Sequence, residues 1–176
     1  AIIVETVQGE GGLNAASKPW LQQIETIARK HGALFIIDDI QAGCGRTGGF
    51  FSFDGMGLSP DLVTMAKSLS GMGLPLAVLL LKPEHDVWKP AEHNGTFRGF
   101  NPAFVTAKAA LETYWRDGAF AAEVRRKADR IHAWLTELAD TLPPGTARPL
   151  GRGLMQGLEL DFDGLASEVA ALAFER

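Results

Sequence analysis

The stretch "FIIDDIQAGCGRTGGFF", residues 35–51, determines the fold class that the sequence predicts. It opens with apolar residues that favour β-strands, runs into Asp38 and Asp39, and ends in a glycine-rich turn. Another apolar run, "AIIVE" at 1–5, precedes it, and a segment with helical spacing over 18–31 separates the two runs. Two strands joined by a helix indicate a βαβ unit and a parallel sheet. We therefore expect an α/β protein with both aspartates at the carboxyl end of a strand.

The rest of the chain continues this alternation of strands and helices. We expect strands over 61–66 and 75–81, helices over 102–114 and 119–140, then a strand over 153–160 and a helix from 164. The helix over 18–31 should be capped by Ser17, end at Gly32 and bury one apolar stripe. That stripe consists of Trp20, Leu21, Ile24, Ile27 and Ala28. A domain boundary is expected near Gly118.

Composition narrows the class of protein and its location. The chain has 176 residues and a net charge of −4, which argues against a nucleic-acid or anionic-membrane partner. No apolar run approaches the roughly 18 residues that would span a bilayer. The single cysteine, Cys44, excludes an internal disulfide and suits the reducing cytoplasm. The chain does not begin with Met, and its last segment stops inside a helical pattern, so we expect an internal part of a longer protein.

The glycine-rich turn itself matches a known nucleotide-binding pattern. Residues 43–48, "GCGRTG", fit G-x-G-x-x-G after a strand, which could cradle a dinucleotide pyrophosphate at the start of a helix. The residues that follow, "GFFSFDGMG" at 49–57, lack helical spacing. The pattern therefore favours a structural turn. The four histidines show no metal-ligand spacing, so no metal site is predicted.

A lysine is the second candidate for chemistry. Lys67 follows the apolar segment "LVTMA" at 62–66, where a neighbouring sheet would bury its stem. Burial lowers the pKa of a lysine and makes its amine a candidate for a Schiff base. Pyridoxal phosphate needs such an amine for its aldehyde and an acid such as Asp38 to keep its ring nitrogen protonated. The alternatives are a surface lysine and solvated aspartates at a strand end.

Four ordered segments carry a resemblance to a known family. They are "ETVQGEGG" (5–12), "LFIIDDIQAGCGRTG" (34–48), "PDLVTMAKSLSGMGLP" (60–75) and "EHNGTFRGFNPAFVTA" (92–107). In order and spacing they resemble the class III (ω-) aminotransferases of pyridoxal phosphate fold type I. The resemblance implies a large-domain portion over 1–118, with a mostly parallel sheet and covering helices. Residues 119–176 would begin a smaller C-terminal α/β domain.

The resemblance also implies an activity and partners. It implies pyridoxal 5′-phosphate as cofactor, amino-acid and keto-acid substrates, and a homodimer or higher homo-oligomer with shared active sites. The first and fourth segments resemble the subgroup that moves the terminal amino group of 2,4-diaminobutyrate to or from 2-oxoglutarate or glutamate. The ornithine, acetylornithine and 4-aminobutyrate types remain alternatives, as does a catalytically incomplete fragment.

Within this resemblance, five residues match cofactor-binding positions. Asp38 matches the aspartate that pairs with the pyridine nitrogen, and Lys67 matches the Schiff-base lysine. Ile40 matches the aliphatic residue on the ring face, and Gln41 the glutamine near the ring hydroxyl. Thr96 matches the threonine that reaches the phosphate of the neighbouring subunit's cofactor.

The substrate positions match less completely. Glu10 matches a glutamate that in related enzymes pairs with a substrate-binding arginine, and Asp39 replaces a glutamate usual in the family. The family reads R-G-x-G before its small-domain strand, where the arginine binds a carboxylate, but Leu150 stands there. A leucine makes no bidentate carboxylate contact. Arg152 or Arg148 is the candidate substitute.

Overall fold

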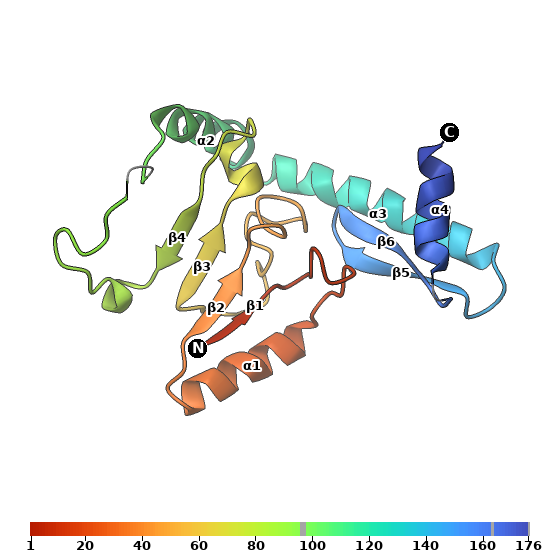
Figure 1. The fold of residues 1–176 in the computed structure, drawn as a ribbon, viewed down its shortest axis with the longest axis horizontal. Coiled ribbons are helices and arrows are strands. Elements are labelled where there is room, and N and C mark those ends of the chain that lie inside the picture. Colours follow the sequence, from red (N-terminus) through yellow and green to blue (C-terminus); the bar gives the residue numbers. More distant parts are fainter. Residues whose placement is uncertain (96–97, 163, 176) are drawn as a thin grey trace.

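A computed structural model describes residues 1–95, 98–162 and 164–175. Strands and helices alternate along the chain (Figure 1). In chain order they are β1 Ile2–Val4, α1 Lys18–Lys30, β2 Phe35–Asp38, β3 Leu62–Met65, the 3₁₀ helix η1 Lys67–Ser70, β4 Val78–Leu81, the 3₁₀ helix η2 Pro83–His85, α2 Asn101–Tyr114, α3 Ala119–Asp140, β5 Ala147–Arg152, β6 Met155–Leu160 and α4 Leu165–Phe174.

The main sheet has the strand order β1-β2-β3-β4. Strands β1, β2 and β3 are parallel, and β4 runs antiparallel to β3. The predicted βαβ unit and mostly parallel sheet are confirmed. The strand expected over 75–81 is shorter, and its Leu79 and Leu80 are exposed.

Helix α1 begins where its cap residue predicts. The Ser17 hydroxyl accepts a hydrogen bond from the Trp20 amide at 3.3 Å, and Gly32 follows the helix with a φ of 62°. The predicted apolar stripe is only partly buried. Leu21 and Ala28 are buried, whereas Trp20 and Ile27 are exposed. The buried stripe is narrower than predicted because α1 contacts the sheet mainly at β2.

Burial alternates along β2 and continues past its end. Phe35 and Ile37 are buried with Ala28 of α1, whereas Ile36 and Asp38 are half-buried. Asp39 follows the same alternation and is only 1% exposed. Asp38 and Asp39 therefore lie on opposite faces of the strand end, as adjacent strand residues should.

A buried carboxylate holds the start of β3. Asp61 is 3% exposed and accepts hydrogen bonds from the Phe35 amide at 2.8 Å, from Arg29 at 2.7 Å and from Lys82 at 3.0 Å. Burial alone would raise the pKa of Asp61, but these hydrogen bonds and the positive charge of Arg29 lower it well below its usual range. This residue therefore ties α1, β2 and the segment after β4 to the strand that leads to Lys67.

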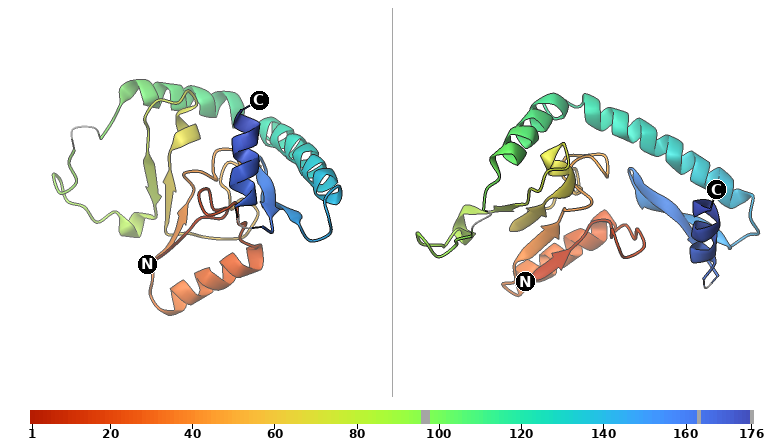
Figure 2. Two further views of the ribbon diagram at one scale, coloured as in Figure 1. Left: turned by 45° about the vertical axis from the view of Figure 1, so that its right-hand side comes forward. Right: turned by 45° about the horizontal axis from the view of Figure 1, so that its top comes forward.

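The second sheet is the β5-β6 hairpin, which packs against α3 and α4 (Figures 1 and 2). The sequence predicted β6 and both helices but not β5. Pro149 and Gly151 lie within β5, and both residue types are depleted in strands, so the segment resembled a loop. The predicted boundary at Gly118 lies immediately before α3, and the division into two domains stays a prediction.

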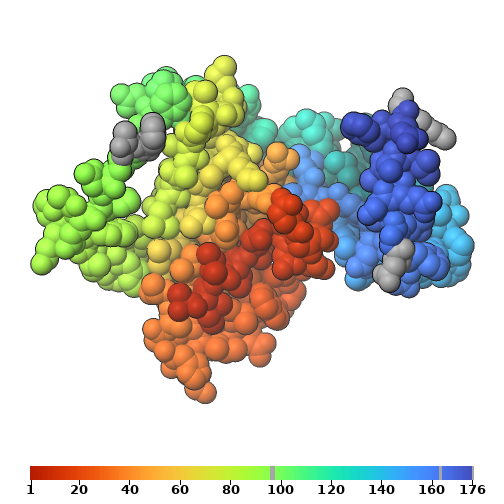
Figure 3. Space-filling model, viewed as in Figure 1, coloured from red at the N-terminus to blue at the C-terminus, as the bar shows by residue number. Residues whose placement is uncertain are grey.

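The hairpin meets the loop that follows β1, as the blue and red atoms of Figure 3 show. A Cβ added at Gly157 would lie 3.1 Å from the Leu13 side chain. Among the helices that the structure describes, none is long and apolar enough to cross a membrane.

Candidate active site

Asp38 is the last residue of β2, and its half-buried carboxylate is held by hydrogen bonds to one of its oxygens. Its Oδ1 accepts hydrogen bonds from the Ile40 amide and from the Thr64 hydroxyl, both at 3.1 Å. Within the described residues no cation forms an ion pair with it. The carboxylate is thus oriented by neutral donors and keeps its negative charge available for a cationic group.

Lys67 lies immediately beyond the end of β3. It opens η1 with a φ of 48°, a left-handed conformation that is uncommon for residues other than glycine. Such strain persists where the surrounding structure holds it, and it concentrates at functional sites. The side chain is exposed, so the predicted burial of its stem is wrong for the described chain. The sheet ends before this residue and leaves its side chain at a cavity.

The register of the sheet relates these two residues. Asp38 pairs with Thr64 across parallel strands, and Lys67 follows Thr64 by three positions in the chain, two residues beyond the end of β3. The carboxyl ends of neighbouring parallel strands meet at one edge of a sheet, where ligands bind in open α/β folds. The cavity at Lys67 has a volume of about 560 Å³ and is also lined by Arg46, Ser68 and residues of the 71–76 loop. Asp38 does not line this cavity.

Gln41 follows the strand end and is fixed by the loop after β1. Its amide donates a hydrogen bond to the Glu10 carboxylate at 3.1 Å. A Cβ added at Gly9 would overlap the Gln41 amide, so a larger residue there would displace the Gln41 side chain. The Gly9 amide in turn donates to the Glu5 carboxylate at 2.8 Å. Glu10 thus contacts Gln41, and its predicted pairing with a substrate-binding arginine stays a prediction.

The glycine-rich segment is a compact turn. The Cys44 amide donates to the Phe50 carbonyl at 2.7 Å, and the Gly45 amide donates to the Gly49 carbonyl at 2.9 Å. The next regular element is β3, so the segment opens no helix whose amides could bind a pyrophosphate. This geometry confirms the prediction of a structural turn.

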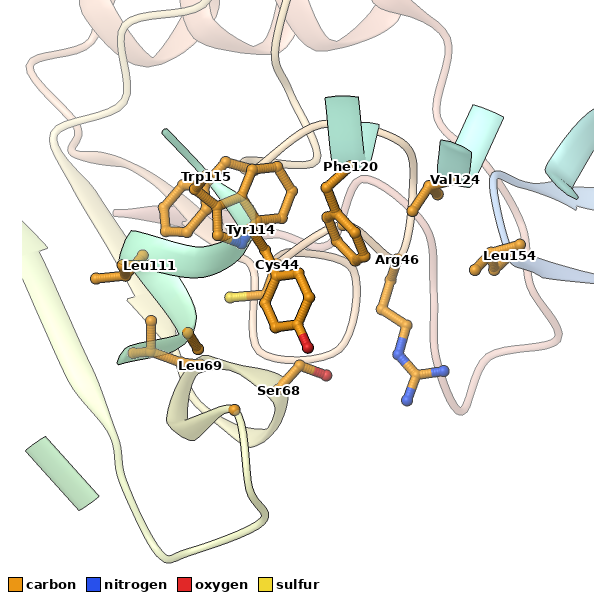
Figure 4. A pocket seen from close by; sticks show the side chains of 14 residues that line it. Cys44, Arg46, Ser68, Leu69, Leu111, Tyr114, Trp115, Phe120, Val124 and Leu154 are labelled. Carbon is orange, nitrogen blue, oxygen red and sulfur yellow. The ribbon is translucent and has the colours of Figure 1, made fainter. Parts of the chain in front are cut away.

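A smaller cavity of about 250 Å³ lies between this turn, η1, α2 and α3 (Figure 4). Its walls are mainly apolar and aromatic, and they include Trp115, Phe120 and Leu111. Arg46 and Ser68 line both this cavity and the one at Lys67. Leu154, between β5 and β6, also lines the smaller cavity, so its walls come from five separate segments and no local sequence pattern indicates the cavity.

The arginines that could replace the missing one differ in their surroundings. Arg148 is exposed and forms an ion pair with Glu159 on the neighbouring strand. Arg152 is half-buried and donates to the Thr6 hydroxyl at 3.0 Å and to the Ser52 carbonyl at 2.7 Å. Leu150 pairs with Gly157 in the hairpin. Thr96 lies outside the described residues.

Sequence reasoning also missed residues that orient the strand end. Thr64 holds Asp38, and Ser52 donates its amide to the Asp39 carboxylate at 3.1 Å. A strand alignment that placed Thr64 opposite Asp38 would have indicated the first contact. Ser52 carries no comparable signal, because the turn that returns it to Asp39 has no regular period.

Comparison with known families agrees with this geometry. Residues 1–175 match the family described as Aminotransferase class-III. The chain belongs to the class III aminotransferases. This family uses pyridoxal phosphate. The match includes both sheets and the described helices.

Curated relatives are similar over the whole chain. The diaminobutyrate–2-oxoglutarate transaminase of Bordetella parapertussis is 55% identical over 100% of this chain and 41% of its own length. The enzyme of the same name from Vibrio cholerae is 52% identical over 100% of this chain and 43% of its own. An uncharacterized aminotransferase of Sinorhizobium fredii is 57% identical over 99% and 39%. The chain thus spans about two fifths of these relatives.

Solved structures of the family share the fold. Acetylornithine aminotransferase from Elizabethkingia anophelis superposes with a TM-score of 0.84, at 27% identity over 96% of this chain and 45% of that one. An ω-transaminase from Thermomicrobium roseum gives 0.81, at 27% identity over 94% and 38%. These similarities confirm the predicted fold class, the pyridoxal phosphate fold type I.

The described residues fit the family's cofactor. The Asp38 carboxylate carries a negative charge and pairs with no described cation, which suits a protonated ring nitrogen. The Lys67 amine forms no hydrogen bond within the described residues and lines a cavity of about 560 Å³. The sheet register places both groups toward the same edge of the sheet, and of the two only Lys67 lines the cavity.

Proposed function

We propose that the whole protein containing this chain is a pyridoxal phosphate-dependent aminotransferase. It would move the terminal amino group of a diamino acid such as 2,4-diaminobutyrate to or from 2-oxoglutarate or glutamate. The observation that carries this proposal is the location of Asp38 and Lys67 at the ends of adjacent parallel strands. The names of the 52–55% identical relatives support the choice of substrate.

Each matched residue has a distinct task in this proposal. The bound cofactor would supply an aldehyde for amines and a ring that withdraws electrons from the substrate carbon. Lys67 Nζ would hold the cofactor through that aldehyde and would move a proton from the amine-bearing carbon of the substrate. Asp38 would keep a positive charge on the ring nitrogen. Ile40 would pack against the ring, and Gln41 would lie near the ring hydroxyl.

Assembly and location complete the proposal. Thr96 would reach the phosphate of the cofactor in a neighbouring subunit, so the protein would form a homodimer or larger homo-oligomer. The negative net charge and single cysteine support a cytoplasmic enzyme with neither nucleic acid nor membrane as partner. The reaction would belong to ectoine biosynthesis, as the resemblance to the diaminobutyrate subgroup implies.

Steady-state kinetics of the whole protein test the substrate. We expect kcat/KM for 2,4-diaminobutyrate with 2-oxoglutarate to exceed the values for ornithine, acetylornithine and 4-aminobutyrate by about tenfold or more. Turnover should require the keto acid, which separates a transferase from an aminomutase. A preference for ornithine, or turnover without a keto acid, would contradict this assignment.

A further inference from the structure

Arg152 connects the hairpin to the loop after β1 and to the turn after β2. It ends β5, and its Nη2 donates to the Thr6 hydroxyl at 3.0 Å and to the Ser52 carbonyl at 2.7 Å. Thr6 is 0% exposed and Ser52 is 4% exposed. One half-buried guanidinium therefore joins residues that lie 146 and 100 positions away in the chain.

The Ser52 contact leads to a buried charge beside the candidate site. The Ser52 amide donates to Asp39 Oδ2 at 3.1 Å, while Asp39 Oδ1 and the Ser52 hydroxyl find no hydrogen-bond partner in the described residues. Burial raises the pKa of Asp39, although hydrogen bonding from Ser52 opposes the shift. Burial lowers the pKa of Arg152, and the charge of Asp39 opposes that shift. An ionised Asp39 therefore favours the cationic form of Arg152, and the two side chains are connected through the backbone of Ser52.

The hydrogen bond with Thr6 connects Arg152 to the loop after β1. Thr6 and Val7 are buried at the start of the loop that carries Glu10. That loop holds Gln41 through the Glu10 carboxylate at 3.1 Å. Arg152 thus contacts the loop that holds Gln41, through Thr6, and the turn that holds Asp39, through Ser52.

We propose that Arg152 is a positioning residue that holds the hairpin against residues 38–41, the segment that carries Asp38 and Gln41. The buried Asp39 acts as its counter-charge. Its role in turnover rests on the proposed aminotransferase function, whereas its link to Asp39 through Ser52 does not. Two N–H bonds of the Arg152 guanidinium already donate to the Thr6 hydroxyl and the Ser52 carbonyl. This role replaces the predicted contact between Arg152 and a substrate carboxylate.

A double-mutant cycle in the whole protein tests the charge pairing. Arg152→Met leaves Asp39 buried without its cation, so it should lower the urea unfolding midpoint clearly. In an Asp39→Asn background the same change removes only the contacts with Thr6 and Ser52, and its effect should be at most about half as large. Arg148→Met is the matched control, because it removes the same charge from an exposed ion pair of the same hairpin. It should shift the midpoint little, and equally in both backgrounds.

Kinetics separate positioning from substrate binding. Arg152→Met should lower kcat by about tenfold with little change in KM for the dicarboxylate, and Arg152→Lys should recover part of kcat. A tenfold or larger rise in KM at unchanged kcat, or equal destabilisation in both Asp39 backgrounds, would overturn the proposal. If the protein instead failed to bind the cofactor at Lys67, the proposed function would fail while the stability cycle still decided the pairing.

Discussion

Replacing Asp61 by asparagine tests how the fold fixes the strand that leads to Lys67. Asparagine keeps one acceptor oxygen, so the Phe35 amide can stay satisfied, but the charge that serves Arg29 and Lys82 is lost. Hydrogen bonds to charged groups contribute about 1.5–3 kcal/mol each. The side chains of Arg29 and Lys82 are 41% and 31% exposed, so solvent screening weakens the interactions of both with Asp61. We expect a net loss of about 2–3 kcal/mol.

Urea unfolding of the whole protein measures this loss. The control is Glu123→Gln, which removes an exposed carboxylate that pairs with Arg126 and should leave the midpoint nearly unchanged. A loss below about 0.5 kcal/mol for Asp61→Asn, the level of an exposed pair, would refute the reasoning.

The same residue predicts a dependence on pH. The pKa of Asp61 is lower in the folded chain than its usual unfolded value of about 3.9. Its contribution is therefore complete above that value and is lost as the pH falls toward the folded pKa. Wild type should lose stability below about pH 4 more steeply than Asp61→Asn. An equal fall in the free energy of unfolding of the two proteins as the pH decreases would contradict this assignment.

Three further predictions concern the candidate site and its turn. Asp38→Asn should keep the fold but lower kcat by roughly 100-fold, because the ring nitrogen loses its counter-charge, and unchanged turnover would argue against that role. Gly43→Ala should cost about 1–3 kcal/mol in urea unfolding, since its Cβ would lie 2.6 Å from Asp39 Oδ2; wild-type stability would contradict this clash. Burial raises the pKa of the Cys44 thiol to about 11, so iodoacetamide should alkylate it slowly at pH 8, and a rate equal to that in urea would exclude this environment.

The sequence predicted what local patterns encode. Apolar runs located β2 and β3, and the side chains that follow them, Asp38 and Lys67, lie at those strand ends in the structure. Ser17 predicted the start of α1 because an N-cap is a local interaction. These features depend on residues close together in the chain.

Contacts between distant segments were not predictable in the same way. Strand β5 was not predicted because it contains Pro149, and proline has a poor strand propensity. The strand forms nevertheless, because it pairs with β6 in a hairpin and proline is tolerated at a sheet edge. The hydrogen bond between Arg152 and Thr6 joins residues that are 146 positions apart in the chain. The exposure of Lys67 depends on where the sheet stops, which apolarity alone did not indicate.

We expect Lys67, just beyond the end of β3, to hold pyridoxal phosphate, with Asp38 as the counter-charge of its ring nitrogen. Borohydride reduction of the cofactor-loaded whole protein, followed by peptide mapping, measures this attachment directly. The label should appear on the peptide containing Lys67 and vanish in Lys67→Ala, while exposed Lys108→Ala, the control, should retain it. Labelling of another lysine, or an unchanged label in Lys67→Ala, would contradict the account.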